Sequence, residues 1–384
     1  MEQRKIFIEA QRLFRKHKHG MDVVALELLQ RLRKLTPAYS FQVMVKNDED
    51  NCLQNSDSLK VSCLQSVFYP LWEQWLLPRK TRGSKKNLLH CTGNTAPIFS
   101  SVPLLVTIHD LIFLEKNYLF SKDGGSLYQR FGNFYRRLIV PLVAKKARHI
   151  ITVSEYQRNI IINRLKISPA KVSVVYNGVD SRFFNHVESP VLSNTLQKYG
   201  IAFPYIFFIG NTEPRKNTRG VIKAFKIFCE QNPELTHRLA IKGLTSRQLS
   251  EKIEECGAQK IAHRIHRLGY IDHADLPVIY QGAEVLWFPS FSEGFGLPII
   301  ESMASGTPVI TSSASVMPEI AGDAALYVDP NVPAQLAAKT KIIFEDPFLK
   351  KDMEEMGRKR AAKFTWEQSV NELMKVYDRL MEEL

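Results

Sequence analysis

Two carboxylates and two glycines lie close together in the stretch 285–312, VLWFPSFSEGFGLPIIESMASGTPVITS. The residues of this group with the chemistry to bind a ligand are Glu293, Gly294, Phe295, Gly296, Leu297 and Glu301. Glycines let backbone amides approach a ligand closely, and amides at the start of a helix favour an anion such as a phosphate. Carboxylates accept hydrogen bonds from sugar hydroxyls. The group therefore predicts a site for a nucleotide sugar.

The surrounding pattern predicts a βαβ unit that positions these groups. An apolar strand covers 285–288, a helix begins at Pro298, and Gly306 ends that helix before a second strand. Proline suits the first helical position, and glycine suits the position after the last turn. We expect Glu293 in the loop and Glu301 in the first helical turn. Gly-x-Gly by itself is a common turn, and Leu-Pro-Ile replaces the third glycine of the dinucleotide-binding fingerprint.

The combination is more specific than its parts. One glutamate followed by Gly-Phe-Gly-Leu-Pro, and a second followed by Ala-Ser-Gly-Thr-Pro-Val, resembles the retaining glycosyltransferases of group 1 (family 4-like), in particular bacterial mannosyltransferases of polysaccharide assembly. The resemblance implies an α/β fold of two facing Rossmann-like domains, called GT-B, with the active site in the interdomain cleft. It implies an acceptor domain over 1–190, a nucleotide-sugar domain over 196–365 after a linker through about Tyr199, and a helix over 366–384 that crosses back to the first domain.

Two further segments place polar side chains where parallel strands end. His109 follows the apolar run around Val106, at the edge of a doubly wound sheet where ligands collect. It resembles the family's histidine that bonds to the transferred sugar. Arg215 and Lys216 follow an expected strand at 205–210 and offer charge-assisted donors for an anion. A basic surface turn is the alternative interpretation of this pair.

The resemblance adds three residues to the donor site. Asn217 belongs to the loop with the two cations, and Ile271 would border the nucleotide base. Gly20 would lie in the loop after a first strand at 5–10, which closes over the donor phosphates in the family. Many members have paired glycines there, so a simple turn glycine is the alternative.

The positive charge is concentrated in the N-terminal half. Residues 1–190 hold 29 Lys plus Arg against 15 Asp plus Glu, whereas the rest holds 23 against 24. Such a field attracts membranes, nucleic acid or phosphorylated acceptors. No apolar run reaches the roughly 18 residues of a spanning helix, and no signal-peptide pattern is present. We therefore predict a cytoplasmic protein that binds an anionic membrane surface through the segments 12–18 and 79–86.

The aromatic segment 71–78, LWEQWLLP, has two interpretations. Its tryptophans and leucines suit an anchor at a membrane interface, and they equally suit a protein core. Core packing is the favoured interpretation.

The residues and the resemblance together predict a metal-independent retaining hexosyltransferase. The resemblance implies that it moves a hexose, with mannose from GDP-mannose the best candidate, to a glycan or lipid-diphosphate-linked acceptor in cell-surface polysaccharide biosynthesis. Arg215, Lys216 and the amides of 294–297 would stabilise the leaving diphosphate, so neither a metal nor another cofactor is expected. Glu301 would hold the ribose and Glu293 the sugar hydroxyls.

Four alternatives remain open. The donor could be a UDP-sugar, or the protein could be a nucleotide-sugar epimerase of the same architecture. A metal-dependent transferase would use Asp48 and Asp50, although these lie in a polar run typical of a solvated loop. A nucleic-acid-binding protein would explain the charge, but no stacking platform accompanies the basic residues.

Overall fold

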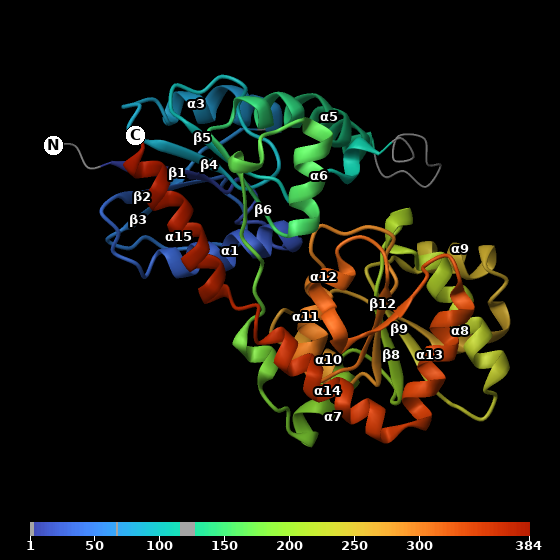
Figure 1. Cartoon of the computed structure of the whole chain (residues 1–384). Helices are drawn as coiled ribbons and strands as arrows, with labels where there is room; N and C mark the ends of the chain where they lie inside the picture. The colour runs from blue at the N-terminus through green and yellow to red at the C-terminus, as the bar shows by residue number, and fades with distance from the viewer. Residues whose placement is uncertain (1–3, 67, 116–126) are drawn as a thin grey trace. The chain divides into compact units, whose positions relative to one another are not determined.

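The computed structural model describes residues 4–66, 68–115 and 127–384, which form two compact units. Val179–Thr365 belongs to the second unit, and the first unit combines the described residues up to Gly178 with Trp366–Leu384. Each unit is built around one parallel β-sheet with helices packed on it (Figure 1). The predicted α/β fold of two Rossmann-like domains is therefore confirmed.

The first unit contains a sheet of seven parallel strands within the described residues, in the order β3-β2-β1-β4-β5-β6-β7. The strands are β1 (Lys5–Glu9), β2 (Ser40–Val45), β3 (Leu59–Cys63), β4 (Leu88–Cys91), β5 (Leu104–Thr107), β6 (His149–Thr152) and β7 (Val172–Val174). The order reverses between β1 and β4, which creates the crevice where doubly wound folds bind ligands.

Helices cover both faces of this sheet. They are α1 (Gly20–Leu32), α2 (Tyr69–Leu71), α3 (Leu77–Lys80), α5 (Leu127–Lys146), α6 (Glu155–Leu165) and α15 (Trp366–Glu382), and a π-helical turn, Trp72–Leu76, joins α2 to α3. Side chains alternate along β1: Ile6 and Ile8 join the core with α1 and α15, and Phe7 joins the core with α3 and α5. The C-terminal helix α15 thus completes one face of the first unit (Figure 1).

The segment 71–78 divides between core and surface. Trp72 is fully buried and donates from Nε1 to the carbonyl oxygen of Leu64 at 3.0 Å. Trp75, one helical turn later, is 53% exposed. The predicted core packing is therefore right for Trp72 and wrong for Trp75. The segment Trp72–Leu76 is a π-helical turn, which is wider than an α-helical turn, so residues three apart along it point in different directions.

The second unit repeats the architecture with six described parallel strands in the order β10-β9-β8-β11-β12-β13. The strands are β8 (Tyr205–Ile209), β9 (Arg238–Lys242), β10 (Ile265–Leu268), β11 (Val285–Phe288), β12 (Val309–Ser312) and β13 (Leu326–Val328). The helices are α7 (Ser189–Lys198), α8 (Thr218–Gln231), α9 (Ser246–Glu255), α10 (Leu276–Gln281), α11 (Leu297–Ala304), α12 (Met317–Ala321), α13 (Pro333–Glu345) and α14 (Pro347–Ala361).

The predicted βαβ unit is β11, α11 and β12. Its first strand has the predicted bounds, and its helix begins one residue before Pro298. The expected linker through Tyr199 is wrong, because α7 occupies it. Pro190 lies in the first turn of α7, and Leu196 is buried, so this segment packs as part of the second unit.

Candidate active site

The loops that follow β8 and β11 meet where the second sheet reverses its order. The two strands are neighbours, with Phe208 paired to Trp287. The amide of Phe291 donates to the carbonyl oxygen of Arg215 at 2.7 Å, and Asn217 Nδ2 donates to the carbonyl oxygen of Pro289 at 3.1 Å. Hydrogen bonds therefore join the two loops at the crevice that this fold uses for ligands.

Glu293 joins the two predicted cations. Arg215 Nη1 lies 2.6 Å from Glu293 Oε2, and Lys216 Nζ lies 2.7 Å from Glu293 Oε1. Arg215 also donates from Nε to Glu213 Oε2 at 2.5 Å. Arg215 Nη1 also donates to the carbonyl oxygen of Ser292 at 3.4 Å. The structure thus brings Arg215, Lys216 and Glu293 together as one charged cluster.

Burial and charge act in opposite directions on this cluster. Glu293 is 6% exposed, and burial raises the pKa of its carboxyl, but Lys216 and Arg215 outweigh burial and hold the pKa at about 2. Burial lowers the pKa of Lys216, although the Glu293 carboxylate opposes that shift. Glu293 is therefore ionised at neutral pH and orients both cations.

The glycine-bearing loop leads into α11. Gly296 caps the helix with a φ of 100°, a conformation that suits glycine. A Cβ built at Gly296 would lie 3.3 Å from Ile299 Cδ1. Phe295 is buried and its ring contacts that of Phe364, with centroids 5.8 Å apart. The side chain of Phe295 therefore anchors the loop, and its contribution to ligand binding would come from the backbone. Gly294 precedes it and Leu297 opens the helix.

Glu301 lies deeper in the helix than predicted. Because Gly296 is the cap and Leu297 the first helical residue, Glu301 falls in the second turn of α11, so the expectation of a first-turn residue is wrong. Tyr280 Oη donates to Glu301 Oε2 at 2.7 Å. Burial raises the pKa of Glu301, while Tyr280 and the cation of Lys242 lower it. Glu301 is thus an oriented acceptor near the end of β9.

Two other predicted donor residues lie on the same edge of the second sheet. Asn217 adopts a left-handed conformation with a φ of 58°, and its Nδ2 also donates to the carbonyl oxygen of Pro330 at 2.7 Å. Its buried side chain therefore positions the loops. Ile271 follows β10 and is 2% exposed, beside the exposed Tyr270. Whether Asn217 and Ile271 touch a donor stays a prediction.

His109 lies two residues beyond β5 in the first unit and is buried. Its Nε2–H donates to the carbonyl oxygen of Thr92 at 2.9 Å, and its amide donates to Asn94 Oδ1 at 2.6 Å. Burial lowers the pKa of the imidazole, which is therefore neutral at pH 7 with Nδ1 as an acceptor.

Gly20 opens α1 in the first unit. No described atom lies within 4 Å of a Cβ built there, so local packing does not require glycine at this position.

Sequence reasoning missed three positioning residues. Ser315 Oγ accepts from the amide of Glu293 at 3.3 Å, Tyr280 orients Glu301, and Asn94 holds the amide of His109. Each lies 15 to 22 residues from its partner, as the separations of these bonds show, and no local motif marks it. These residues could not be found from the sequence, because folding brings each of them to its partner.

The acidic residues 48–50 lie next to the basic residues Lys16 and Lys18. Lys18 pairs with Asp50, and Lys16 Nζ lies 3.2 Å from Glu49 Oε2. Among residues 4–66, 68–115 and 127–384, no group of three or more His, Cys, Asp or Glu side chains is arranged to hold a metal ion. Glu49 and Asp50 thus pair with lysines, and the metal-dependent alternative that uses Asp48 and Asp50 stays open.

The fold and the charged cluster define a two-unit, doubly wound α/β protein whose second unit carries Arg215, Lys216 and Glu293 where its sheet reverses its order. Family models agree with this class. Residues 196–360 match the model described as glycosyl transferases group 1, and residues 18–183 match glycosyltransferase family 4. The chain belongs to the group 1 glycosyltransferases of the GT-B type.

Curated relatives are similar over part of their length. The chain is 31% identical to O-antigen chain mannosyltransferase B of Escherichia coli over 237 residues, which is 61% of each chain. It is 27% identical to O-antigen chain mannosyltransferase RfbU of Salmonella typhimurium over 277 residues, 72% of this chain and 70% of that protein.

Solved structures share the fold over nearly the whole chain. HepE of Anabaena in complex with UDP superposes with a TM-score of 0.71 at 18% identity, covering 98% of this chain and all of HepE. Sucrose-phosphate synthase of Thermosynechococcus elongatus gives a TM-score of 0.73 at 19% identity over the full length of both chains.

Proposed function

We propose that the protein is a retaining glycosyltransferase that moves a hexose from a nucleotide-diphosphate sugar to the hydroxyl of a glycan or lipid-diphosphate-linked acceptor. The observation that carries the proposal is the pairing of Arg215 and Lys216 through Glu293 at the reversal point of the second sheet. Mannose from GDP-mannose is the leading donor, because the two curated relatives are O-antigen chain mannosyltransferases. Those relatives also support a role in cell-surface polysaccharide biosynthesis.

In this mechanism the cations act on the leaving group. The bond between C1 of the sugar and the phosphate oxygen breaks, and its electron pair passes to the departing diphosphate. Arg215, Lys216 and the amides of 294–297 stabilise the growing negative charge. The acceptor oxygen bonds to C1 on the same face, and its proton passes to the departing phosphate. Two protein cations supply the charge that a metal supplies elsewhere, so we propose that transfer requires no metal.

The remaining site residues position the substrate. Glu293 accepts from hydroxyls of the sugar while it holds the cations, and Glu301 accepts from the ribose hydroxyls. His109 is proposed to orient the transferred sugar through Nδ1, because its Nε2–H already donates to Thr92.

Donor identity is tested by thermal unfolding with GDP, UDP and ADP. A ligand at about 100 times its Kd adds roughly 2.7 kcal/mol of stability, so the nucleotide that stabilises most names the donor class. UDP is the alternative, because HepE was crystallised with UDP and with UDP-glucose. A protein that none of the three stabilises would contradict the proposal. A product assay that finds donor converted without any acceptor would indicate an epimerase instead.

The cation pair is tested by Arg215→Ala and Lys216→Ala. Each removes a charge-assisted donor, so transfer should slow by about two orders of magnitude, equivalent to roughly 3 kcal/mol. Arg219→Ala is the matched control, because Arg219 lies on the neighbouring helix and pairs with Glu255 at the surface. Near-normal turnover of either variant at saturating donor would remove these residues from the mechanism.

We also propose a cytoplasmic location with peripheral attachment to the membrane. None of the helices in the described residues is long and apolar enough to cross a bilayer. The excess positive charge of residues 1–190 supports contact with an anionic surface.

A further inference from the structure

Two helical segments of the first unit lie side by side. One runs from Phe68 through α2 and α3, and the other is α5 (Figure 1). The rings of Phe68 and Phe131 have centroids 5.7 Å apart, and Gln74 Nε2 donates to Tyr135 Oη at 2.8 Å. Because both segments connect the carboxyl end of one strand to the amino end of the next, they run in the same direction over one face of the sheet.

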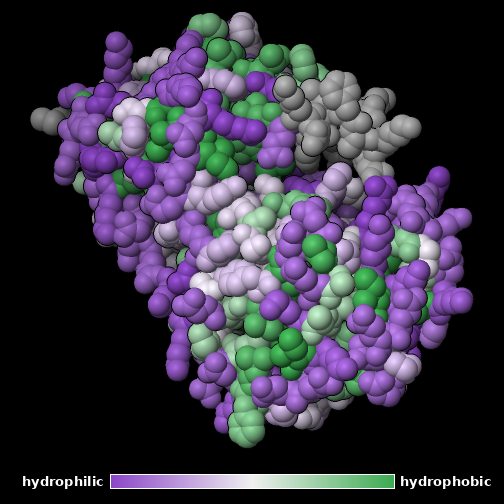
Figure 2. Space-filling model, turned by 45° about the vertical axis from the view of Figure 1, so that its right-hand side comes forward, coloured by the Kyte–Doolittle hydropathy of each residue, from purple (hydrophilic) through white to green (hydrophobic). Residues whose placement is uncertain are grey.

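An apolar ridge follows these segments on their outer side. It consists of Phe68, Leu71, Trp75, Phe131, Phe134, Leu138 and Leu142, each between 43% and 55% exposed. The members recur every three or four residues, which is the spacing of one helical face. Figure 2 shows hydrophobic surface gathered between hydrophilic side chains over the first unit. Exposed apolar side chains gathered on one helical face in this way mark an interaction site.

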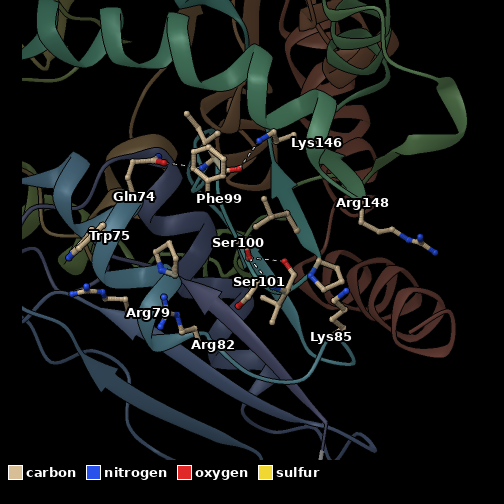
Figure 3. Close-up of a pocket in the computed structure, with 15 residues that line it drawn as sticks. Gln74, Trp75, Arg79, Arg82, Lys85, Phe99, Ser100, Ser101, Lys146 and Arg148 are labelled. Carbon is tan, nitrogen blue, oxygen red and sulfur yellow. Dashed lines mark hydrogen bonds between the residues drawn. The ribbon is translucent and has the colours of Figure 1, made fainter.

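A basic pocket of about 820 Å³ lies where the two segments end. Its cations are Arg79, Arg82, Lys85, Lys146 and Arg148. Figure 3 shows Trp75, Arg79 and Arg82 on one side, Lys146 and Arg148 on the other, and Ser100 and Ser101 between them.

Two aromatic rings at this pocket carry cations. Arg79 lies 4.0 Å from the ring centroid of Trp75, and Lys146 lies 4.5 Å from that of Phe99, which is 78% exposed. Protein surfaces that enter the headgroup region of a bilayer are rich in aromatic residues beside Lys and Arg.

The charge of this surface is one-sided. The segments 68–86 and 127–148 contain eleven Lys and Arg residues and one acidic residue, Glu73. Glu73 is completely buried, where it accepts hydrogen bonds from Tyr69 and Tyr135 at 2.5 Å each. Among the side chains that the structure describes, the exposed part of both segments is therefore apolar along the ridge and cationic around the pocket.

We propose that the apolar ridge and the basic pocket form a docking surface for an anionic lipid bilayer. The ridge enters the interface between headgroups and acyl chains, and the pocket receives the phosphate of a lipid headgroup. This inference identifies the membrane contact of the proposed transferase and rests on that proposed function. The observations that support it come from the first unit alone.

The docking surface is separate from the expected transfer residues. The pocket lines the amino ends of β4, β5 and β6, since Lys85, Leu104 and Arg148 lie before or at the start of these strands. His109 follows the carboxyl end of β5. A strand of four residues spans roughly 13 Å, so the basic pocket lies about that far from the edge of the sheet that holds His109.

The other predicted membrane contact, the segment 12–18, is not part of this surface. Arg12 Nε lies 3.4 Å from Asp22 Oδ1, Lys16 pairs with Glu49, and Lys18 pairs with Asp50. Carboxylates therefore offset three of the four cations of that segment, and we omit it from the proposal.

Cosedimentation with vesicles at low salt tests the proposal. The full-length protein should pellet with vesicles of phosphatidylcholine and phosphatidylglycerol and stay in solution with phosphatidylcholine alone. Arg82→Gln with Lys85→Gln should lower partitioning roughly 30-fold, since each cation near an anionic surface contributes a factor of about five. Leu138→Gln with Leu142→Gln should lower it at least about tenfold by removing apolar insertion.

Matched controls lie in the second unit. Lys359→Gln with Lys363→Gln removes two exposed charges, and Phe348→Gln removes an apolar side chain that is 88% exposed. These variants should pellet like the unaltered protein. Stabilisation by the donor nucleotide should be the same in all variants, which shows that they fold. Absence of that stabilisation in the unaltered protein would count against the proposed transferase and not against the docking surface.

Three results would overturn the docking surface. The unaltered protein could remain in the supernatant with anionic vesicles, or the pocket and ridge variants could pellet as well as their controls. The third result would be a dimer of the unaltered protein in sedimentation velocity that is absent in the double variant Leu138→Gln with Leu142→Gln. The ridge would then be an interface between two copies of the chain.

Discussion

Replacing Glu293 by glutamine isolates the electrostatic contribution of the charged cluster. The variant keeps the shape of the side chain but removes the charge that faces Arg215 and Lys216. The pKa of Glu293 falls from 4.5 to about 2 on folding, a difference of about 2.5 units, which corresponds to roughly 3 kcal/mol of stability at neutral pH. Burial also lowers the pKa of Lys216, so keeping the lysine charged in this cluster costs free energy. About 3 kcal/mol is therefore an upper value for the net stabilisation by the cluster.

The sign of that pKa shift determines how the stabilisation changes with pH. Because the folded-state pKa lies below the ordinary value of 4.5, the folded chain binds the proton more weakly than the unfolded chain. The stabilisation is therefore complete above about pH 5 and disappears as the pH falls toward 2. The gap in unfolding free energy between the two proteins should persist at about pH 6 and narrow by about pH 3.

Urea unfolding followed by circular dichroism measures the gap, and hydrogen exchange of the amides in β11 and α11 assigns it to the second unit. Glu255→Gln is the matched control, because Glu255 pairs with Arg219 and Lys252 but is 41% exposed, and such surface pairs contribute under about 1 kcal/mol. If Glu293→Gln unfolds with the same free energy as the unaltered protein at pH 7, the cluster does not stabilise the fold as argued.

Three further outcomes can be measured on the same protein. Gly296→Ala should lower stability by about 1 to 2 kcal/mol, because its φ of 100° is unfavourable for a residue with a Cβ; equal melting curves would contradict this. Tyr280→Phe should cost about 1.5 to 3 kcal/mol, since the Glu301 carboxylate loses its charge-assisted hydrogen bond, and unchanged urea midpoints would contradict that role. Transfer should continue in EDTA; abolition by the chelator and recovery with Mg²⁺ would favour the alternative that uses Asp48 and Asp50.

The βαβ unit of the second domain was predictable because its signals are local. An apolar run, glycines at a turn and a proline near a helix start are properties of neighbouring residues. The elements β11 and α11 begin within one residue of the predicted starts, and β12 follows Gly306 as expected. The edge of the sheet that holds Arg215, Lys216 and Glu293 was predictable for a related reason. Parallel strands in one doubly wound sheet all end at the same edge.

The ion pairs within that edge were decided by tertiary structure. Glu293 meets Arg215 across 78 positions of the chain, and the sequence assigned the two to separate tasks, one for the sugar and one for the phosphate. Their pairing depends on which strands become neighbours, and strand order is a property of the whole sheet. The same holds for Tyr280 with Glu301.

The first unit shows most clearly what could not be predicted from the sequence. From the sequence, 12–18 and 79–86 are equivalent basic segments, and Trp72 and Trp75 are equivalent aromatic residues. Folding brings carboxylates to the first segment and leaves the second beside an exposed apolar ridge. The sequence by itself determined the fold class, the family motifs and the excess of charge, because these depend on composition and local spacing. Tertiary structure decided which charges are offset and which side chains reach the surface, because both depend on contacts between residues far apart in the chain.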